Sequence, residues 1–286
     1  MTVQDSRERM AEASQDYAPP LHRETFLQLA GRIREVAGIV LRDNKISMVQ
    51  ARLAPRLREL ELPGYEAYLD YLSGPGGEAE KSKFVSALTT NLTGFFREAH
   101  HFAHLEKDVI GPALAAGAPR FRLWSAGCSS GEEPYTIQMV MARAGGLKAS
   151  WDYLLLATDI DEKILDRARN GVYDAERCEA IPDPLRERYM ESLPGDRLKV
   201  RPDLRQAIRF RRLNLMESFP FKGPFDAIFC RNVLIYFNAE TKKRIVERFT
   251  ACLGPRRFLY LGHSESLLGA HPDLELVGRT IYQKRT

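Results

Sequence analysis

Several features that mark common protein classes are missing from this sequence. Its four cysteines, Cys128, Cys178, Cys230 and Cys252, lie far apart and form no CxxC pair. This spacing argues against a zinc site and against a disulfide framework, and it suits a reducing cytoplasm. The first 20 residues have no apolar core, so they do not resemble a secretory signal. No run approaches the ~20 apolar residues of a membrane helix, so we expect no membrane insertion.

A strong excess of one charge is also missing. The 286 residues include 42 Lys+Arg and 38 Asp+Glu, which gives a formal net charge of +4. This mild balance permits an acidic partner surface but does not demand nucleic acid, and we expect no nucleic-acid partner. The length allows two domains or one large domain. Nothing in the sequence suggests a large apolar interface, so we expect a monomer.

The composition along the chain predicts its organisation. Residues 1–20 are polar and are expected to form a mobile tail. Residues 21–76 carry apolar side chains at helical spacing and predict a small helical domain. The run SGPGG at 73–77 is the clearest linker, and a linker helix over 77–90 is expected to bridge to the second domain. That second domain is expected to span 91–286.

The predicted helical domain has two features that bear on function. Pro55 falls inside its second helix and is expected to kink or split that helix. Arg52 and Arg56 are four residues apart and share a helix face, and Arg58 lies nearby. These arginines could bind an acidic partner, or they could simply form a solvated helix face.

Residues 121–136 organise the rest of the chain. An apolar, β-prone run at 121–124 passes into small residues at 125–131 and then into Glu132-Glu133-Pro134, which begins a helical pattern. A strand, a tight turn and a helix opened by proline are typical of a nucleotide-binding βαβ unit. The turn has neither the Lys-Ser/Thr of a P-loop nor GxGxxG, which argues against phosphate-gripping and NAD-dependent proteins. The two carboxylates favour a ligand without phosphate, such as S-adenosylmethionine, or they merely complement the helix dipole.

An unusual loop precedes this stretch. Residues 89–98 combine small polar residues with Phe95, Phe96 and an arginine, a composition that could cover a bound cofactor. Alternatively, a helix begins here and both rings are simply buried. His100 and His104 have the spacing of a metal pair, but further ligands are missing, so we predict a helix surface and no metal.

The region that follows predicts an α/β fold. The apolar run 151–160 is a strand that ends at Asp159, where a carboxylate can accept both ribose hydroxyls or cap the next helix. Further strands are expected at 208–215, 225–230 and 257–262, and a small antiparallel β insert at about 193–207. A terminal β-hairpin is predicted over 274–284. Strands alternating with helices indicate a doubly wound, mainly parallel sheet. With the terminal hairpin, this is the architecture of class I, Rossmann-like methyltransferases.

Several motifs, taken together and in order, closely resemble the chemotaxis receptor methyltransferases of the CheR family. They are NLTGFFRE at 91–98, SSGEEPY at 129–135, ATDID at 157–161, FDAIFCRN at 225–232, IYF at 235–237 and GHSES at 262–266. The likeness covers roughly residues 21–286. It implies methyl transfer from S-adenosylmethionine to glutamate side chains of chemoreceptor cytoplasmic helices, with S-adenosylhomocysteine as product.

The resemblance also assigns roles to individual residues. It implies that Arg97 and Tyr236 lie at the methyl-transfer site and that Arg52, Arg56 and Arg58 belong to a receptor-docking domain. The cofactor-binding positions that it implies are Asn91, Thr93, Arg97, Glu133, Asp159, Asn214, Leu215, Arg231 and Asn232. Relatives that bind a tether peptide at the receptor C-terminus have a longer, glycine-richer β insert, whereas residues 193–198 are short here. We therefore predict that no tether peptide is needed.

Methyl transfer to a glutamate side chain does not need a nucleophilic triad, and none is evident in the sequence. A glutamate is already ionised near neutral pH, so no general base is required, and positioning in a dry site is the main task. A nucleic-acid methyltransferase is the first rival, but 231–234 reads RNVL rather than an Asn-Pro-Pro-Tyr-like tetrad. Methylation of another acceptor, or a non-catalytic adaptor that binds S-adenosylmethionine, remain alternatives.

Overall fold

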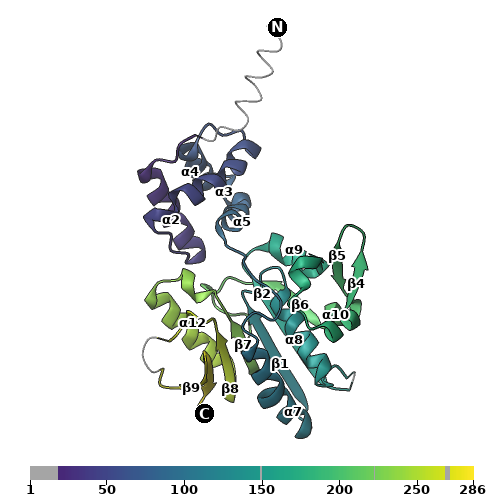
Figure 1. The fold of residues 1–286 in the computed structure, drawn as a ribbon. Coiled ribbons are helices and arrows are strands. Elements are labelled where there is room, and N and C mark those ends of the chain that lie inside the picture. The colour runs from purple at the N-terminus through teal and green to yellow at the C-terminus, as the bar shows by residue number, and fades with distance from the viewer. Residues whose placement is uncertain (1–18, 149, 222, 268–270) are drawn as a thin grey trace. The chain divides into compact units, whose positions relative to one another are not determined.

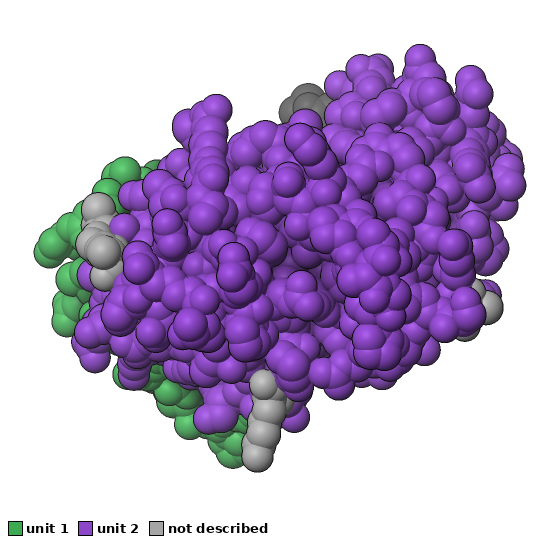
Figure 2. Space-filling view, turned by 90° about the horizontal axis from the view of Figure 1, so that it is seen from below, with its two compact units in different colours: residues 1–89 green, residues 90–286 purple. Residues whose placement is uncertain are grey.

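The computed structural model describes residues 19–148, 150–221, 223–267 and 271–286. Most of the predicted N-terminal tail, 1–18, lies outside the described residues. The chain forms two compact units, 1–89 and 90–286, which Figure 2 distinguishes by colour. The boundary falls at Thr89/Thr90 rather than in the glycine-rich run near Gly76.

The first unit is helical. Its helices are α2 (Arg23–Ala37), η1 (Asp43–Lys45), α3 (Ile46–Glu59), α4 (Tyr65–Ser73) and α5 (Gly77–Leu88). Helix α5 contacts α2, α3 and α4, so it is part of this unit and not a separate linker helix. The sequence pattern suggested a linker because the glycines precede it, but its buried Phe84, Val85 and Leu88 belong to the helical core. Pro55 lies inside α3, which is continuous from 46 to 59, so the proline does not split the helix.

The second unit is built on a seven-stranded sheet with the order β6-β2-β1-β7-β8-β10-β9 (Figure 1). Its strands are β1 (Arg120–Ala126), β2 (Asp152–Asp159), β6 (Ile208–Arg212), β7 (Phe225–Cys230), β8 (Leu253–Leu261), β9 (Leu274–Gly278) and β10 (Ile281–Lys284). The first five strands of this order are parallel, whereas β10 runs antiparallel to both β8 and β9. The predicted doubly wound, mainly parallel sheet with a terminal hairpin is therefore confirmed.

Helices cover both faces of this sheet. The helices of this unit are α6 (His100–His104), η2 (Leu105–Ile110), α7 (Gly111–Ala115), α8 (Glu132–Arg143), α9 (Glu162–Asn170), η3 (Ala175–Cys178), α10 (Asp183–Tyr189), α11 (Pro202–Gln206), η4 (Leu234–Tyr236) and α12 (Ala239–Cys252). One apolar core joins side chains of α6, α7 and α8 to the sheet, and a second core joins α12 to the other face. Strand β7 is buried at every position, as its continuous apolar run predicted.

The antiparallel insert is confirmed but its bounds differ from the prediction of about 193–207. It is a three-stranded sheet of β3 (Val172–Asp174), β5 (Arg197–Val200) and β4 (Met190–Leu193), in that order. The insert thus begins near 172, and part of the predicted range is the helix α11. Strand β3 is only three residues long and pairs with a strand 23 residues further on, which a local pattern does not reveal.

The sheet topology places a candidate ligand site. Because β1, β2, β6 and β7 are parallel, their carboxyl ends meet at one edge of the sheet, where ligands of such folds bind.

A search of the described helices found none with the length and apolar character of a membrane span.

Candidate functional site

The turn between β1 and α8 has the tight geometry that its small residues predict. Gly127 and Gly131 have φ values of 81° and 100°, and Ser129 has a φ of 50°. A Cβ on Gly131 would come within 2.9 Å of both the Ala168 Cβ and the Tyr173 hydroxyl, so glycine is required there. The turn therefore packs its main chain closely against α9 and β3.

The two glutamates that begin α8 have different partners. Glu133 is 7% exposed, accepts the Ser125 hydroxyl (2.6 Å) and forms an ion pair with Arg231 (3.0 Å). Glu132 is fully buried, accepts the Ser130 hydroxyl (2.7 Å) and pairs with Arg177. Glu133 therefore connects the ends of β1 and β7, whereas Glu132 faces the insert side of the turn.

Asp159 lies at the carboxyl end of β2 and organises the next part of the site. Its carboxylate accepts the Ser129 N–H (2.8 Å) and the Asp161 N–H (3.0 Å). Burial raises the pKa of Asp159 to about 6, against the effect of these main-chain hydrogen bonds. Asp161 caps α9 by accepting from Lys163 and Ile164, so the capping role is taken by Asp161 and Asp159 is left facing the turn.

Asn91 joins this group from the loop that precedes α6. Its side-chain amide donates to Asp161 (3.1 Å), and its carbonyl accepts the Ser129 hydroxyl (3.1 Å). Beyond β6, the Leu213 N–H donates to the Asp159 carbonyl (2.9 Å), which places the following Asn214 and Leu215 beside the β2 end. Four segments distant in sequence thus meet at one edge of the sheet.

Arg231 is the buried cation of the site and immediately follows β7. It is 7% exposed, pairs with Glu133, lies 3.7 Å from a Glu98 carboxylate oxygen and donates to the Arg97 carbonyl. Its guanidinium also lies 5.4 Å from the centre of the Phe102 ring. Among the described residues its buried Nε has no hydrogen-bond partner, so a donor remains in the site.

The loop after Arg231 is held by a residue that sequence reasoning did not single out. Glu265 is 4% exposed and accepts the N–H groups of Asn232 (2.7 Å), Ile235 (3.1 Å) and Gly262 (2.7 Å). Asn232 has a φ of 60°, and Tyr236 donates to the Thr90 carbonyl (3.4 Å). The GHSES motif contained Glu265, but two of its three partners lie 30 and 33 residues away in sequence.

The aromatic loop is partly structural. Phe95 is 2% exposed and packs edge-on against Tyr173, and Phe96 packs against Phe102. Thr93 is half-buried, while Arg97 is exposed and donates to the Leu92 carbonyl (3.0 Å). The rings support the loop, whereas the Arg97 side chain is accessible to solvent.

One group of described side chains could hold a metal ion, namely Glu98, His100 and His101. His104, which the spacing had paired with His100, instead bonds the Tyr260 hydroxyl (2.8 Å). Burial and the Arg231 charge lower the pKa of His101 to about 3. Because Arg231 lies 3.7 Å from the Glu98 carboxylate, its charge disfavours a cation at this position.

Of the three arginines in the helical unit that were predicted to dock a partner, the structure buries one. Arg56 is 5% exposed and forms a two-point ion pair with Glu80, which also accepts the Tyr68 hydroxyl (2.9 Å). It is a core residue and cannot present its charge to a partner. Arg52 donates to the Thr89 carbonyl (2.6 Å) at the end of α5, and Arg58 is exposed.

The site therefore combines a buried carboxylate at the end of β2, an acidic helix start and a tight turn without a phosphate-binding lysine. The residues at 91–283 match the family model for the CheR methyltransferase S-adenosylmethionine-binding domain, and those at 24–89 match the CheR methyltransferase all-alpha domain. Fold and site thus define an S-adenosylmethionine-dependent methyltransferase.

Comparison with whole relatives narrows the class further. The chain is 42% identical over 266 residues to chemotaxis protein methyltransferase 2 of Pseudomonas aeruginosa, covering 91% of this chain and 92% of that protein. It is 40% identical over 265 residues to the chemotaxis protein methyltransferase of Salmonella typhimurium, covering 90% and 88%. The chain belongs to the CheR family: it is a chemotaxis receptor methyltransferase, a protein-glutamate O-methyltransferase.

The residues present fit S-adenosylmethionine. Asp159 offers carboxylate oxygens where ribose hydroxyls are bound in such folds, and Glu133 offers an anion suited to an ammonium group. The buried, unpartnered Nε of Arg231 is a further donor beside them. No part of this donor set calls for a phosphate.

The pKa of Asp159 predicts a pH dependence of ligand binding. Two hydroxyl donors require an ionised carboxylate, whereas the carboxyl group is protonated below pH about 6. We expect S-adenosylhomocysteine affinity to rise about tenfold per pH unit up to pH ~6 and then level off. Calorimetry from pH 5 to 8 would measure this. Asp159→Asn should bind weakly with a flat profile, and a flat wild-type profile would contradict the assignment.

Because this carboxyl pKa is raised on folding, its effect on stability has the opposite sign. The folded protein holds the proton more tightly than the unfolded chain, so ligand-free stability should fall as pH rises from about 4 to about 6.

Proposed function

We propose that the residues at the carboxyl ends of β1, β2, β6 and β7 hold the methyl donor while an ionised receptor glutamate enters beside Tyr236. The observation that supports this is two groups of contacts at one edge of the sheet: Arg231 with Glu133, and Ser129, Asp159, Asn91 and Asp161 with one another. The cofactor-binding residues proposed are Asn91, Thr93, Arg97, Glu133, Asp159, Asn214, Leu215, Arg231 and Asn232.

The chain contributes orientation and exclusion of water. When bound, S-adenosylmethionine supplies an electrophilic methyl group on a cationic sulfonium. An acceptor carboxylate is already charged at neutral pH, so no side chain has to remove a proton. We propose that Phe95 and Phe237, which are both buried, help to exclude water from the site, which favours a reaction in which opposite charges cancel. We propose that Arg97, which is exposed, meets the carboxylate of the methyl donor and steers the acidic acceptor.

Tyr236 is proposed to orient the acceptor through its hydroxyl. The hydroxyl contacts the Thr90 carbonyl at only 3.4 Å, so it can turn to a substrate without breaking a strong bond. We expect Tyr236→Phe to lower kcat about tenfold or more and to leave S-adenosylhomocysteine binding within about twofold. Steady-state methylation of a receptor cytoplasmic fragment and calorimetry measure the two effects. An equal loss of both would assign Tyr236 to cofactor binding instead.

We also propose that the enzyme acts on its receptor without a tether peptide. The turn from β4 to β5 comprises only residues 194–196, which supports a compact insert. Deleting the receptor's C-terminal peptide should leave kcat/KM unchanged within about twofold. Low-micromolar binding of a tether peptide in calorimetry would contradict this.

The overall function is tested by radiolabelled methyl transfer to a panel of receptor cytoplasmic fragments. The expected product is a base-labile label, because an ester hydrolyses in base. A base-stable label would indicate another acceptor, and binding of the methyl donor without transfer would indicate an adaptor. We further propose that the protein acts as a monomer in the cytoplasm, where receptor cytoplasmic helices are accessible.

A further inference from the structure

A group of arginines lies along the edge strand β6 of the catalytic unit. Arg169 of α9, Arg205 of α11, and Arg209 and Arg211 of β6 line a hollow of about 360 Å³ with Ile208 and Phe210. No carboxylate is among the residues that line it. We call these four residues the arginine edge.

The partners of the arginine edge leave most of its charge unbalanced. Arg209 and Arg211 each donate to a main-chain carbonyl, of Gln206 and Phe210 respectively. Within the described parts of the chain, neither forms an ion pair with a carboxylate, and the buried Nε of Arg205 has no hydrogen-bond partner. Arg169 is different, because Glu162 (2.7 Å) and Asp166 (2.6 Å) pair with it.

The arginine edge is continuous with the site. Strand β6 is the outermost strand in its half of the sheet, so its outer edge has no strand partner among the described residues. Arg209 and Arg211 alternate along it and therefore face the same side. Arg212, the next residue, is in register with Asp159, so the arginines begin within about 10 Å of the β2 end.

We propose that the arginine edge docks the acidic, glutamate-bearing helical segment of the receptor. This inference rests on the proposed function, because that function requires a substrate with several ionised glutamates next to the site. Arg56 cannot supply this docking charge, because Glu80 neutralises it inside the helical unit. An anionic helix lying along β6 would meet guanidinium groups and leave its target glutamate near Tyr236 and Asp159.

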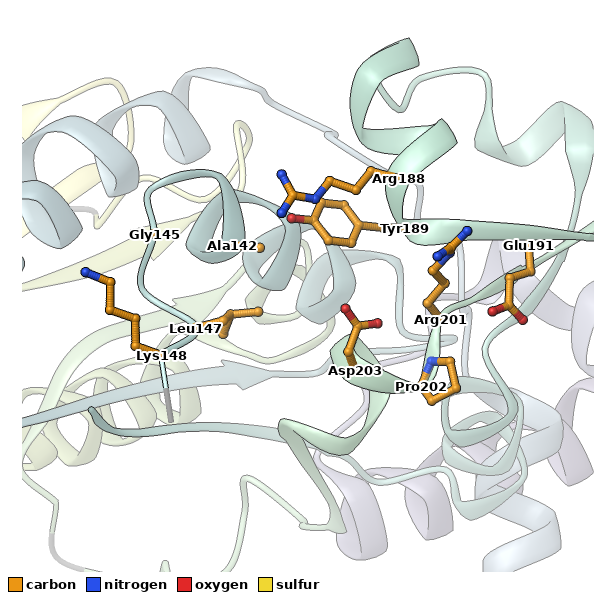
Figure 3. Close-up of a pocket in the computed structure, with 10 residues that line it drawn as sticks. All are labelled: Ala142, Gly145, Leu147, Lys148, Arg188, Tyr189, Glu191, Arg201, Pro202 and Asp203. Carbon is orange, nitrogen blue, oxygen red and sulfur yellow. The ribbon is translucent and has the colours of Figure 1, made fainter. Parts of the chain in front are cut away.

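A second hollow in the same unit provides the control. It has a volume of about 680 Å³ and is lined by Lys148, Arg188 and Arg201 but also by Glu191 and Asp203 (Figure 3). Arg188 lies over the Tyr189 ring, 5.3 Å from its centre. Because acidic side chains share this hollow with the basic ones, it does not select an anion.

The test compares two double charge reversals, Arg209→Glu/Arg211→Glu and the control Arg188→Glu/Arg201→Glu, whose side chains are all exposed. The substrate is a receptor cytoplasmic fragment without its C-terminal peptide. The first variant should lose about tenfold or more in kcat/KM at low salt, and the loss should shrink in 0.5 M NaCl. Its S-adenosylhomocysteine affinity should equal that of wild type, and the control should stay within about twofold.

Each other outcome overturns the proposal. Wild-type kcat/KM in the first variant, or an equal loss in the control, excludes docking at the arginine edge. Loss of inorganic phosphate binding with unchanged methylation would assign the arginines to a small-anion site instead. Failure of the proposed function itself would be visible separately, as absence of base-labile label with the wild-type enzyme.

Discussion

Glu133→Gln is expected to reduce S-adenosylhomocysteine affinity at least 100-fold and to lower the stability of the catalytic unit by about 3 kcal/mol. The carboxylate is 7% exposed and is paired with Arg231, which is equally buried. Removing its charge leaves the Arg231 cation buried without its closest anion, which is strongly destabilising. It also removes the anion proposed to meet the ammonium group of the methyl donor. Calorimetry and denaturant unfolding measure the two effects.

The neighbouring glutamate is the matched control. Glu132 begins the same helix and is fully buried, but it pairs with Arg177, whose side chain is 43% exposed. Glu132→Gln should therefore cost stability while S-adenosylhomocysteine affinity stays within about threefold. If both variants bound the ligand equally poorly, the helix start would act only through folding and the assignment of Glu133 would be wrong.

The difference between these two glutamates shows what the sequence could and could not predict. Adjacent carboxylates after a small-residue turn predicted a site for a ligand without phosphate. This prediction was possible because it depends only on residues that are neighbours in sequence. Which carboxylate faces the site depends on Arg231, 98 residues further along the chain. The strand β7 and the strand-end Asp159 were predicted for the same reason, since an apolar run and an acidic residue at its end are local signals.

Long-range partners explain the errors as well. Arg56 looked like a surface residue because its helix spacing matched that of Arg52, but Glu80, 24 residues away, draws it into the core. Helix α5 looked like a linker because glycines precede it, although its apolar side chains complete the helical unit. In both cases tertiary contacts overrode a correct local pattern.

Glu265→Ala is expected to lower kcat at least 50-fold, although Glu265 is not among the residues proposed to bind the cofactor or the acceptor. Its carboxylate holds three main-chain N–H groups on the loop from Arg231 to Tyr236 and at the end of β8. Without it, the buried Gly262 N–H loses its acceptor at a cost of about 1–3 kcal/mol, and the part-buried N–H groups of Asn232 and Ile235 turn to water as the loop relaxes. Asn232 and Tyr236 then leave the geometry that the reaction needs, because small displacements of positioned groups slow transfer strongly.

A buried carboxylate on β7 separates positioning from general stability. Asp226, at the opposite end of β7, is 9% exposed, accepts the Arg122 N–H (2.7 Å) and pairs with Arg257 (3.0 Å). Asp226→Asn should destabilise the unit but keep kcat within about twofold, because it lies far from the carboxyl end of the strand. Glu265→Gln retains one acceptor oxygen and should recover part of the lost kcat. If Asp226→Asn lost as much kcat as Glu265→Ala at equal stability, Glu265 would be a structural residue and not a positioning one.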